Sequence, residues 1–356
     1  MQATSERLLG LDLARFLAFA GMVIVNFSVV MGATPGPDGW ANILSSSLEG
    51  RAAASFVVLA GIGLGLAAER TGFTSTRLAT MKRAAFLLVV GLLNMLIFDA
   101  DIIHYYAVYF LFGMACLRFT DTQLWVTIGA LIAGFFVLVL VLDFDQGWQW
   151  ETYTYTDFWT PQGFIRNLFF NGWHPVVPWL AFLLFGIFLA RRPLSERRTQ
   201  LWLVVVGSAA IVSAHIVSAW LTSALPSYDG ETLTILYSVK PVPPMPLYMI
   251  AGMGAAALLI GLCLLLVGVL KNGFLLRVFT APGHQTLTLY IAHIFVGMGT
   301  LEMLGFLADQ YSGTMSMTHS VVAALLFIVA AVLYANIWAA FFKRGPVEWI
   351  MRKVAG

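Results

Sequence analysis

The Lys and Arg residues of this chain are concentrated in alternate loops. If the apolar stretches are membrane spans and the chain starts inside, the intervening loops alternate between the two sides. Of the 20 Lys and Arg residues, all but Arg51, Arg166 and Lys240 then lie on the cytoplasmic side. An excess of Lys and Arg in cytoplasmic loops sets the orientation of multi-span proteins. The pattern therefore predicts the spans and their direction together, with the N and C termini in the cytoplasm.

The composition supports a chain that lies mostly within lipid. Hydrophobic residues make up 60% and charged residues 11%, whereas charged residues approach a quarter of a soluble domain. A net charge of +2 gives no indication of a nucleic-acid partner. We expect an all-α polytopic integral membrane protein, with residues 1–356 forming a single domain. Since a span needs roughly 20 apolar residues, we expect ten, at residues 16–31, 52–68, 84–98, 104–117, 124–142, 174–190, 201–224, 247–270, 285–307 and 321–342.

The first apolar run predicts the location of the protein. It follows Arg7 and Arg15 and is too long for the core of a signal peptide, so we expect an uncleaved span. A bacterial inner (plasma) membrane is the expected location. Two long connections fall on the outer side, an aromatic one at residues 143–173 and a proline-rich one at 225–246. The aromatic loop is typical of an interfacial anchor, or of a loop that contacts substrate.

The polar residues in and near the first two spans each have two interpretations. Asp12 and Arg15 are one helical turn apart at the cytoplasmic end. They form either a boundary ion pair or a binding site for an anionic donor. Asn26, near the outer end, either bonds a neighbouring helix or holds an acyl carbonyl or a sugar hydroxyl. Glu49 and Arg51 lie on the outer side, directly before the second span. They form either a local ion pair or part of a functional site.

Histidines near the outer side are the candidate bases. His104 follows Asp101 by three residues, so the carboxylate could orient its ring. His174 stands before Pro175 and Pro178 where the chain re-enters the membrane, at an outer helix mouth open to an acceptor. A single buried histidine is more often a packing residue, but several converging polar groups favour a site. No two histidines have ligand spacing on one helix, so we expect no metal.

At these residues the sequence resembles the transmembrane acyltransferase superfamily. That superfamily includes heparan-α-glucosaminide N-acetyltransferase and a bacterial integral-membrane family known as a domain of unknown function. The matching pieces run in order along the whole chain, at residues 11–15, 22–27, 48–51, 56–61, 171–179, 287–293 and 344–352.

The resemblance implies an enzyme that moves an acetyl or other acyl group from cytoplasmic acyl-CoA to an acceptor on the outer side. In the heparan enzyme a histidine of the first outer loop is taken as catalytic, with an asparagine beside it. Asn26 matches that asparagine, but the corresponding loop here, residues 34–40, contains no histidine. Either another residue supplies the base, or the reaction differs.

The expected acceptor is a hydroxyl or amine of an extracytoplasmic sugar or envelope glycolipid. We expect His174 as the base and His104, oriented by Asp101, as second choice. Asn26 and Arg51 are the candidate carbonyl donors, with Glu49 orienting Arg51. The candidate acyl-CoA contacts are Asp12, Arg15, His284, Tyr290 and Arg352.

Two other classes fit the same residues. A transporter or flippase of a small polar or lipid-linked solute would use the polar cavity without a covalent step. A structural membrane partner would tolerate apolar replacement of the intramembrane polar residues. Besides the lipid bilayer, a homodimer is compatible with the sequence.

The topology can be tested by cysteine labelling in intact cells. A cysteine at Trp150 should react with an impermeant reagent, and one at Ser195 should react only after the cells are opened. Labelling of Ser195→Cys in intact cells would reverse the orientation.

Overall fold

The computed structural model describes residues 8–35, 39–224, 232–270, 273–307 and 315–355. Arg7, Lys271, part of the first outer loop (36–38) and part of the proline-rich loop (225–231) lie outside these ranges.

Nearly every element is a helix. In chain order they are α1 (Leu9–Val30), α2 (Gly39–Leu48), α3 (Arg51–Thr71), α4 (Phe73–Asn94), α5 (Ile103–Cys116), α6 (Asp121–Val141), β1 (Trp148–Gln149), β2 (Thr154–Tyr155), α7 (Pro161–Arg166), the π-helix η1 (Asn167–Asn171), α8 (Val176–Ala190), α9 (Arg197–Ala224), α10 (Thr232–Leu236), α11 (Pro246–Leu270), α12 (Phe274–Thr280), the 3₁₀-helix η2 (Pro282–His284), α13 (Thr286–Ala292), the π-helix η3 (His293–Met298), α14 (Gly299–Met303), α15 (Met317–Phe341) and α16 (Pro346–Ala355). An all-α membrane protein is confirmed, with one short antiparallel hairpin, β1–β2, in the aromatic loop.

The expected count of ten spans is not confirmed. Among the described residues, seven helices are long and apolar enough to cross a membrane, or eight if the bent pair Pro161–Asn171 and Val176–Ala190 is one span. The expected spans at 84–98 and 104–117 account for two of the differences. They correspond to α4, whose first half carries Lys82 and Arg83, and to α5, which has only 14 residues. A helix of 14 residues is about 21 Å long, too short for a hydrocarbon core of about 30 Å.

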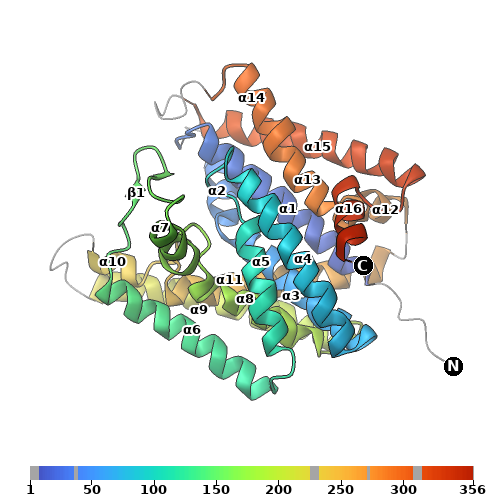
Figure 1. The fold of residues 1–356 in the computed structure, drawn as a ribbon, viewed down its shortest axis with the longest axis horizontal. Helices are drawn as coiled ribbons and strands as arrows, with labels where there is room; N and C mark the ends of the chain where they lie inside the picture. Colours follow the sequence, from blue (N-terminus) through green and yellow to red (C-terminus); the bar gives the residue numbers. More distant parts are fainter. Residues whose placement is uncertain (1–7, 36–38, 225–231, 271–272, 308–314, 356) are drawn as a thin grey trace.

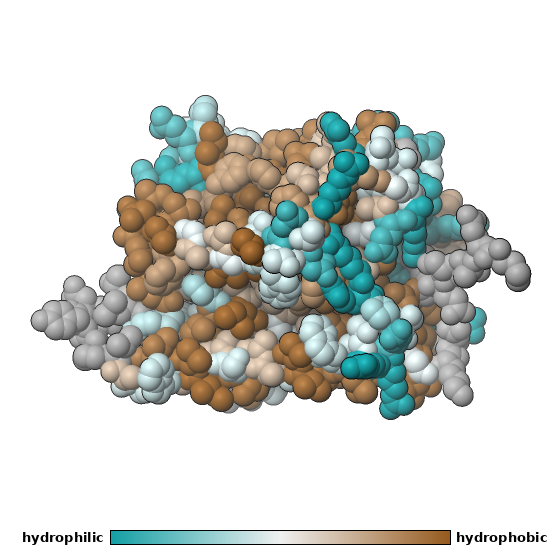
Figure 2. Space-filling view, turned by 90° about the horizontal axis from the view of Figure 1, so that it is seen from below, coloured by the Kyte–Doolittle hydropathy of each residue, from teal (hydrophilic) through white to brown (hydrophobic). Residues whose placement is uncertain are grey.

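The short elements lie mainly at two opposite ends of the bundle (Figure 1). The hairpin, α7 and α10 lie at the left of the view, and we call this the loop end. The start of α1, α12 and α16 lie at the right, and we call this the basic end. The face seen in Figure 2 is largely hydrophobic, and hydrophilic side chains collect toward the basic end. Of the spans of α6 and α9 only 17% is buried, as expected of helices that face lipid.

Helix α3 crosses α8 at two facing glycines. A Cβ atom on Gly61 would come within 2.1 Å of the Leu183 carbonyl oxygen, and one on Gly186 within 2.1 Å of the Val58 carbonyl oxygen. Small residues let two backbones approach this closely, which is how helices pack tightly inside a membrane. The crossing places α3 against the segment that precedes α8, where His174 lies.

Replacing Gly61 should destabilise the bundle, because a methyl group there must displace backbone. We expect Gly61→Ala to lower the melting temperature in detergent, by an amount equivalent to about 1–3 kcal/mol. Gly129→Ala on α6 is the matched control, since nothing lies within 4 Å of its added Cβ atom. Equal melting temperatures for the two variants would contradict the close crossing.

Candidate active site

Cationic side chains surround a cavity at the basic end. This basic cavity holds about 530 Å³ and lies between α3, α4, η2 and α16. Its basic lining residues are Arg83, His284, Lys343, Arg344 and Arg352, and its acidic lining residue is Glu348. Guanidinium groups suit phosphate oxygens geometrically. The cavity can therefore take a polyanionic ligand.

A buried carboxylate positions two basic side chains, His284 in the lining of this cavity and Arg15 beside it. Asp12 is 1% exposed, and one of its oxygens accepts a hydrogen bond of 2.6 Å from Arg15. The other oxygen accepts from Nε2 of His284 at 3.0 Å, which ties α1 to η2. Asp12 was expected as a donor contact, but burial makes it a positioning residue for Arg15 and His284.

Glu348 fastens α16 over the same region. Its carboxylate accepts hydrogen bonds from the backbone N–H groups of Leu287 (2.7 Å) and Thr288 (3.1 Å), at the start of α13. An acidic group is well placed there, because a helix N-terminus carries unsatisfied N–H groups and a positive dipole. The contact holds Met351 and Arg352 of α16 against the basic cavity.

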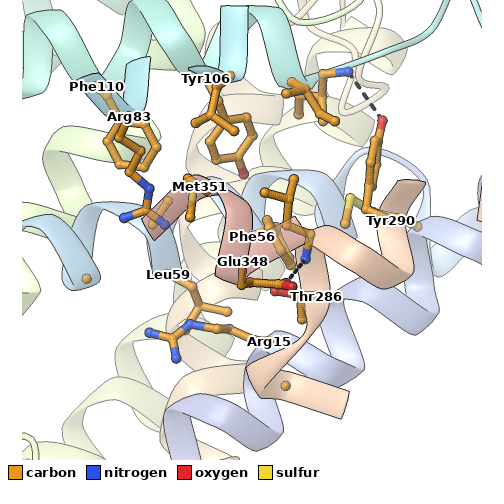
Figure 3. A pocket seen from close by; sticks show the side chains of 18 of the residues that line it. Arg15, Phe56, Leu59, Arg83, Tyr106, Phe110, Thr286, Tyr290, Glu348 and Met351 are labelled. Atoms are coloured by element: carbon orange, nitrogen blue, oxygen red, sulfur yellow. Dashed lines mark hydrogen bonds between the residues drawn. The ribbon is translucent and has the colours of Figure 1, made fainter. Parts of the chain in front are cut away.

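A second cavity continues from the first toward the middle of the bundle (Figure 3). This central cavity holds about 330 Å³ and shares Arg83, His284 and Glu348, among others, with the basic cavity. Its walls are mostly apolar, and Arg15 and Arg83 extend into it from α1 and α4 (Figure 3). Such a passage suits a long ligand with an anionic head and a less polar arm.

A third cavity lies at the loop end, and Met22 lines both this cavity and the central cavity. This histidine cavity holds about 100 Å³ and brings together Asn26, Glu49 and His174. Trp173 and Trp179 complete its polar lining, and both indole N–H groups lack a hydrogen-bond partner among the described residues. Buried polar groups are normally paired, so these groups are available to a bound molecule.

His174 is fixed by its backbone and by ring contacts. Its carbonyl oxygen accepts a hydrogen bond of 2.5 Å from the Tyr109 hydroxyl. Its ring packs edge-on against Trp179 at 4.6 Å and Tyr105 at 5.9 Å between centroids. Nδ1 of His174 is buried and has no partner within the described chain. His174, which was expected at an outer helix mouth, thus lines a cavity, and one of its ring nitrogens has no hydrogen-bond partner in the described chain.

The aromatic loop closes over this segment through Asn171. The Asn171 amide donates to the carbonyls of Phe144 and Gln146, both at 2.8 Å, and its oxygen accepts from Tyr155 at 2.7 Å. Trp148 donates to the Asn171 carbonyl at 2.6 Å. Burial raises the pKa of Tyr155, which stays a neutral hydrogen-bond donor. The loop is therefore anchored directly before His174.

Asn26 has a partner that no local pattern indicates. Its Nδ2 lies 3.0 Å from Nε2 of His293. Nδ1 of His293 donates to the Tyr290 carbonyl, so Nε2 accepts from Asn26 and the ring is neutral. His293 begins the π-helix η3, and π-helical turns often mark functional sites. Asn26 keeps its carbonyl oxygen and one N–H for the histidine cavity.

Two family models match the chain. Residues 7–225 match the family model described as heparan-alpha-glucosaminide N-acetyltransferase, catalytic. Residues 186–356 match the model described as protein of unknown function (DUF418). No curated protein matches the chain.

The chain belongs to the transmembrane acyltransferase superfamily of the heparan-α-glucosaminide N-acetyltransferase type, in its DUF418 branch. The resemblance seen in the sequence is confirmed. Membership indicates a multi-pass membrane protein with acyltransferase activity.

His104, the second candidate base, lines none of the three cavities. Asp101 and His104 are both fully buried, and Nδ1 of His104 donates to Asp101 at 3.2 Å. Asn94 donates to the same carboxylate at 2.6 Å, and the Tyr290 hydroxyl lies 3.5 Å from it. The orientation of His104 by Asp101 is present as expected. The pair nevertheless lines none of the three cavities, so it fits a structural role.

Tyr290 was expected to contact the acyl-CoA donor, and its hydroxyl and its ring have different surroundings. Its hydroxyl accepts from the backbone N–H of Ile102 at 3.3 Å, and its ring lines the central cavity (Figure 3).

Arg51, expected as a carbonyl donor oriented by Glu49, lies outside the histidine cavity. Its guanidinium bonds the carbonyls of Ser46 and Ser47 and, at 3.0 Å, Nε2 of His215 on α9. Among the described residues there is no ion pair between Glu49 and Arg51, and Arg51 does not line the histidine cavity. Glu49 faces the cavity and Arg51 turns toward α9, since neighbouring positions at a helix start point in different directions.

The sequence analysis missed Arg83, His293 and Glu348 as site residues. Arg83 was counted only as a topology marker, although its place at the cytoplasmic end of a short span resembles that of Arg15. His293 and Glu348 lay within matching family segments but had no assigned role. Among the described residues, no group of three or more His, Cys, Asp or Glu converges as a metal site requires.

Proposed function

We propose that this protein transfers an acetyl or other acyl group from cytoplasmic acyl-CoA to a hydroxyl or amine of an extracytoplasmic sugar or envelope glycolipid, in a bacterial inner membrane. The observation that carries the proposal is the succession of three cavities. The basic cavity shares Arg83, His284 and Glu348 with the central cavity, and Met22 lines both the central cavity and the histidine cavity. Reactants from opposite sides of a bilayer need such a passage to meet.

The basic end supplies the contacts for the donor. The phosphates of acyl-CoA would lie among Arg83, Arg344 and Arg352, with Arg15 and His284 at the inner edge. The acyl-carrying arm would extend along the apolar walls of the central cavity. Its thioester would then reach the histidine cavity, which has room for a small acyl group.

The chemistry requires a base and groups that hold the carbonyl oxygen. His174 would take the proton of the acceptor as its oxygen or nitrogen attacks the thioester carbon. The tetrahedral intermediate then expels the CoA thiolate, which receives the proton from His174. Asn26, held by His293, retains an N–H that can stabilise the oxyanion, and Glu49 can bind a hydroxyl or amine of the acceptor.

The donor half of the proposal predicts that Arg15→Ala weakens acetyl-CoA binding by about 10- to 100-fold, because a charged hydrogen bond contributes about 1.5–3 kcal/mol. Arg15→Lys should restore only part of the affinity, since an ammonium cannot make two aligned contacts. Isothermal titration on purified protein measures both. Arg77→Ala is the control, because Arg77 is exposed and lines none of the three cavities. Normal binding by folded Arg15→Ala would make Arg15 a boundary charge.

The catalytic half predicts that His174→Ala and His174→Asn lower transfer by about 10²–10⁴-fold, the usual cost of losing a general base. Transfer is measured with radiolabelled acetyl-CoA and an envelope-lipid extract, and acetyl-CoA binding should persist. His319→Ala is the control, since His319 bonds Ser316 outside the three cavities. If folded His174 variants keep half their activity, the base is another residue. If wild-type protein binds a solute and moves it without turnover of acetyl-CoA, the protein is a transporter.

A further inference from the structure

Three tyrosines of α5 differ in where their hydroxyl groups point. The Tyr105 hydroxyl donates to Oδ1 of Asn167 at 2.6 Å, and the Tyr109 hydroxyl donates to the His174 carbonyl. The Tyr106 hydroxyl is buried and has no hydrogen-bond partner in the described part of the chain. The side chain of Tyr106 is only 7% exposed.

Tyr106 lines the central cavity and points into it from α5 (Figure 3). Aromatic neighbours support its ring, with centroids 6.2 Å away at Phe56, 5.7 Å at Tyr109 and 6.0 Å at Phe110. The ring is therefore held in place while its hydroxyl faces the cavity.

A buried hydroxyl without a partner costs free energy, and phenylalanine would fill the same space without that cost. A group of this kind in a folded protein needs an explanation, and a ligand that supplies the missing partner is one. A phenol can donate to a carbonyl oxygen.

We propose that the Tyr106 hydroxyl donates a hydrogen bond to an amide carbonyl of the pantetheine arm of coenzyme A. This inference rests on the proposed function. Arg15 and Arg83 line the same cavity and would hold the phosphates. Tyr106 lines neither the basic cavity nor the histidine cavity. Tyr106 is therefore placed for the arm, whereas the phosphates would lie where the central and basic cavities share Arg83. The reacting thioester would lie in the histidine cavity.

The proposal assigns Tyr106 a positioning role, since it holds the donor and takes no part in bond making. Its removal should weaken the ground-state complex. Coenzyme A and acetyl-CoA share the arm, so both ligands should be affected to the same degree.

The test compares Tyr106→Phe with Tyr105→Phe in the full-length protein, by titration with coenzyme A and with acetyl-CoA. Tyr106→Phe should weaken both ligands by about 2- to 10-fold, the contribution of one neutral hydrogen bond. Tyr105→Phe should bind both ligands as wild type does. Without ligand the order of stability should reverse, because Tyr105→Phe loses a hydrogen bond to Asn167 and Tyr106→Phe loses none. We expect a lower melting temperature only for Tyr105→Phe.

Three results would overturn the inference while the proposed function stands, provided that wild-type protein binds coenzyme A. They are unchanged affinity in Tyr106→Phe, a loss confined to acetyl-CoA, and a fall in melting temperature equal to that of Tyr105→Phe. If wild-type protein binds neither ligand, the proposed function fails and this inference fails with it.

Discussion

The close packing of α3 against α8 is the contact on which the rest of the site depends. Helix α3 contributes to all three cavities, with Gly63 in the basic cavity, Phe56 and Leu59 in the central one and Ala52 in the histidine cavity. Its distance from α8 is set where Gly61 meets Gly186. A larger residue at either position would clash with the backbone of the other helix and push α3 and α8 apart.

Around this contact the bundle satisfies most of its buried polar groups internally. The carboxylate of Asp12 is bound by Arg15 and His284, and that of Asp101 by Asn94 and His104. This is required in an apolar medium, where each unsatisfied group costs several kcal/mol. Among the buried polar atoms without a partner in the described chain, those of Tyr106, Trp173, His174 and Trp179 belong to residues that line a cavity. Others, such as Nε2 of His104, belong to residues that line none of the three cavities.

Two of the expected catalytic residues illustrate the difference between local and tertiary information. His174 was identified from its neighbours in the chain, Pro175 and Pro178, and in the structure it lines the histidine cavity. Arg51 was identified by equally local reasoning, but its guanidinium bonds His215, 164 positions away. The first inference concerned the end of a segment, whereas the second depended on which helix lies beside it.

The sequence by itself determined that this is an all-α membrane protein of the acyltransferase superfamily. Hydropathy acts along each helix, and the family segments can be read as strings of neighbouring residues. Only the tertiary structure decided the partners across the bundle, such as Asn26 with His293 over 267 positions and Asp12 with His284 over 272. The expected count of ten spans is not confirmed, because α5 is short and α4 carries charged residues. Helix crossing, set by contacts as small as that between two glycines, decides which polar faces meet, and no local pattern encodes it.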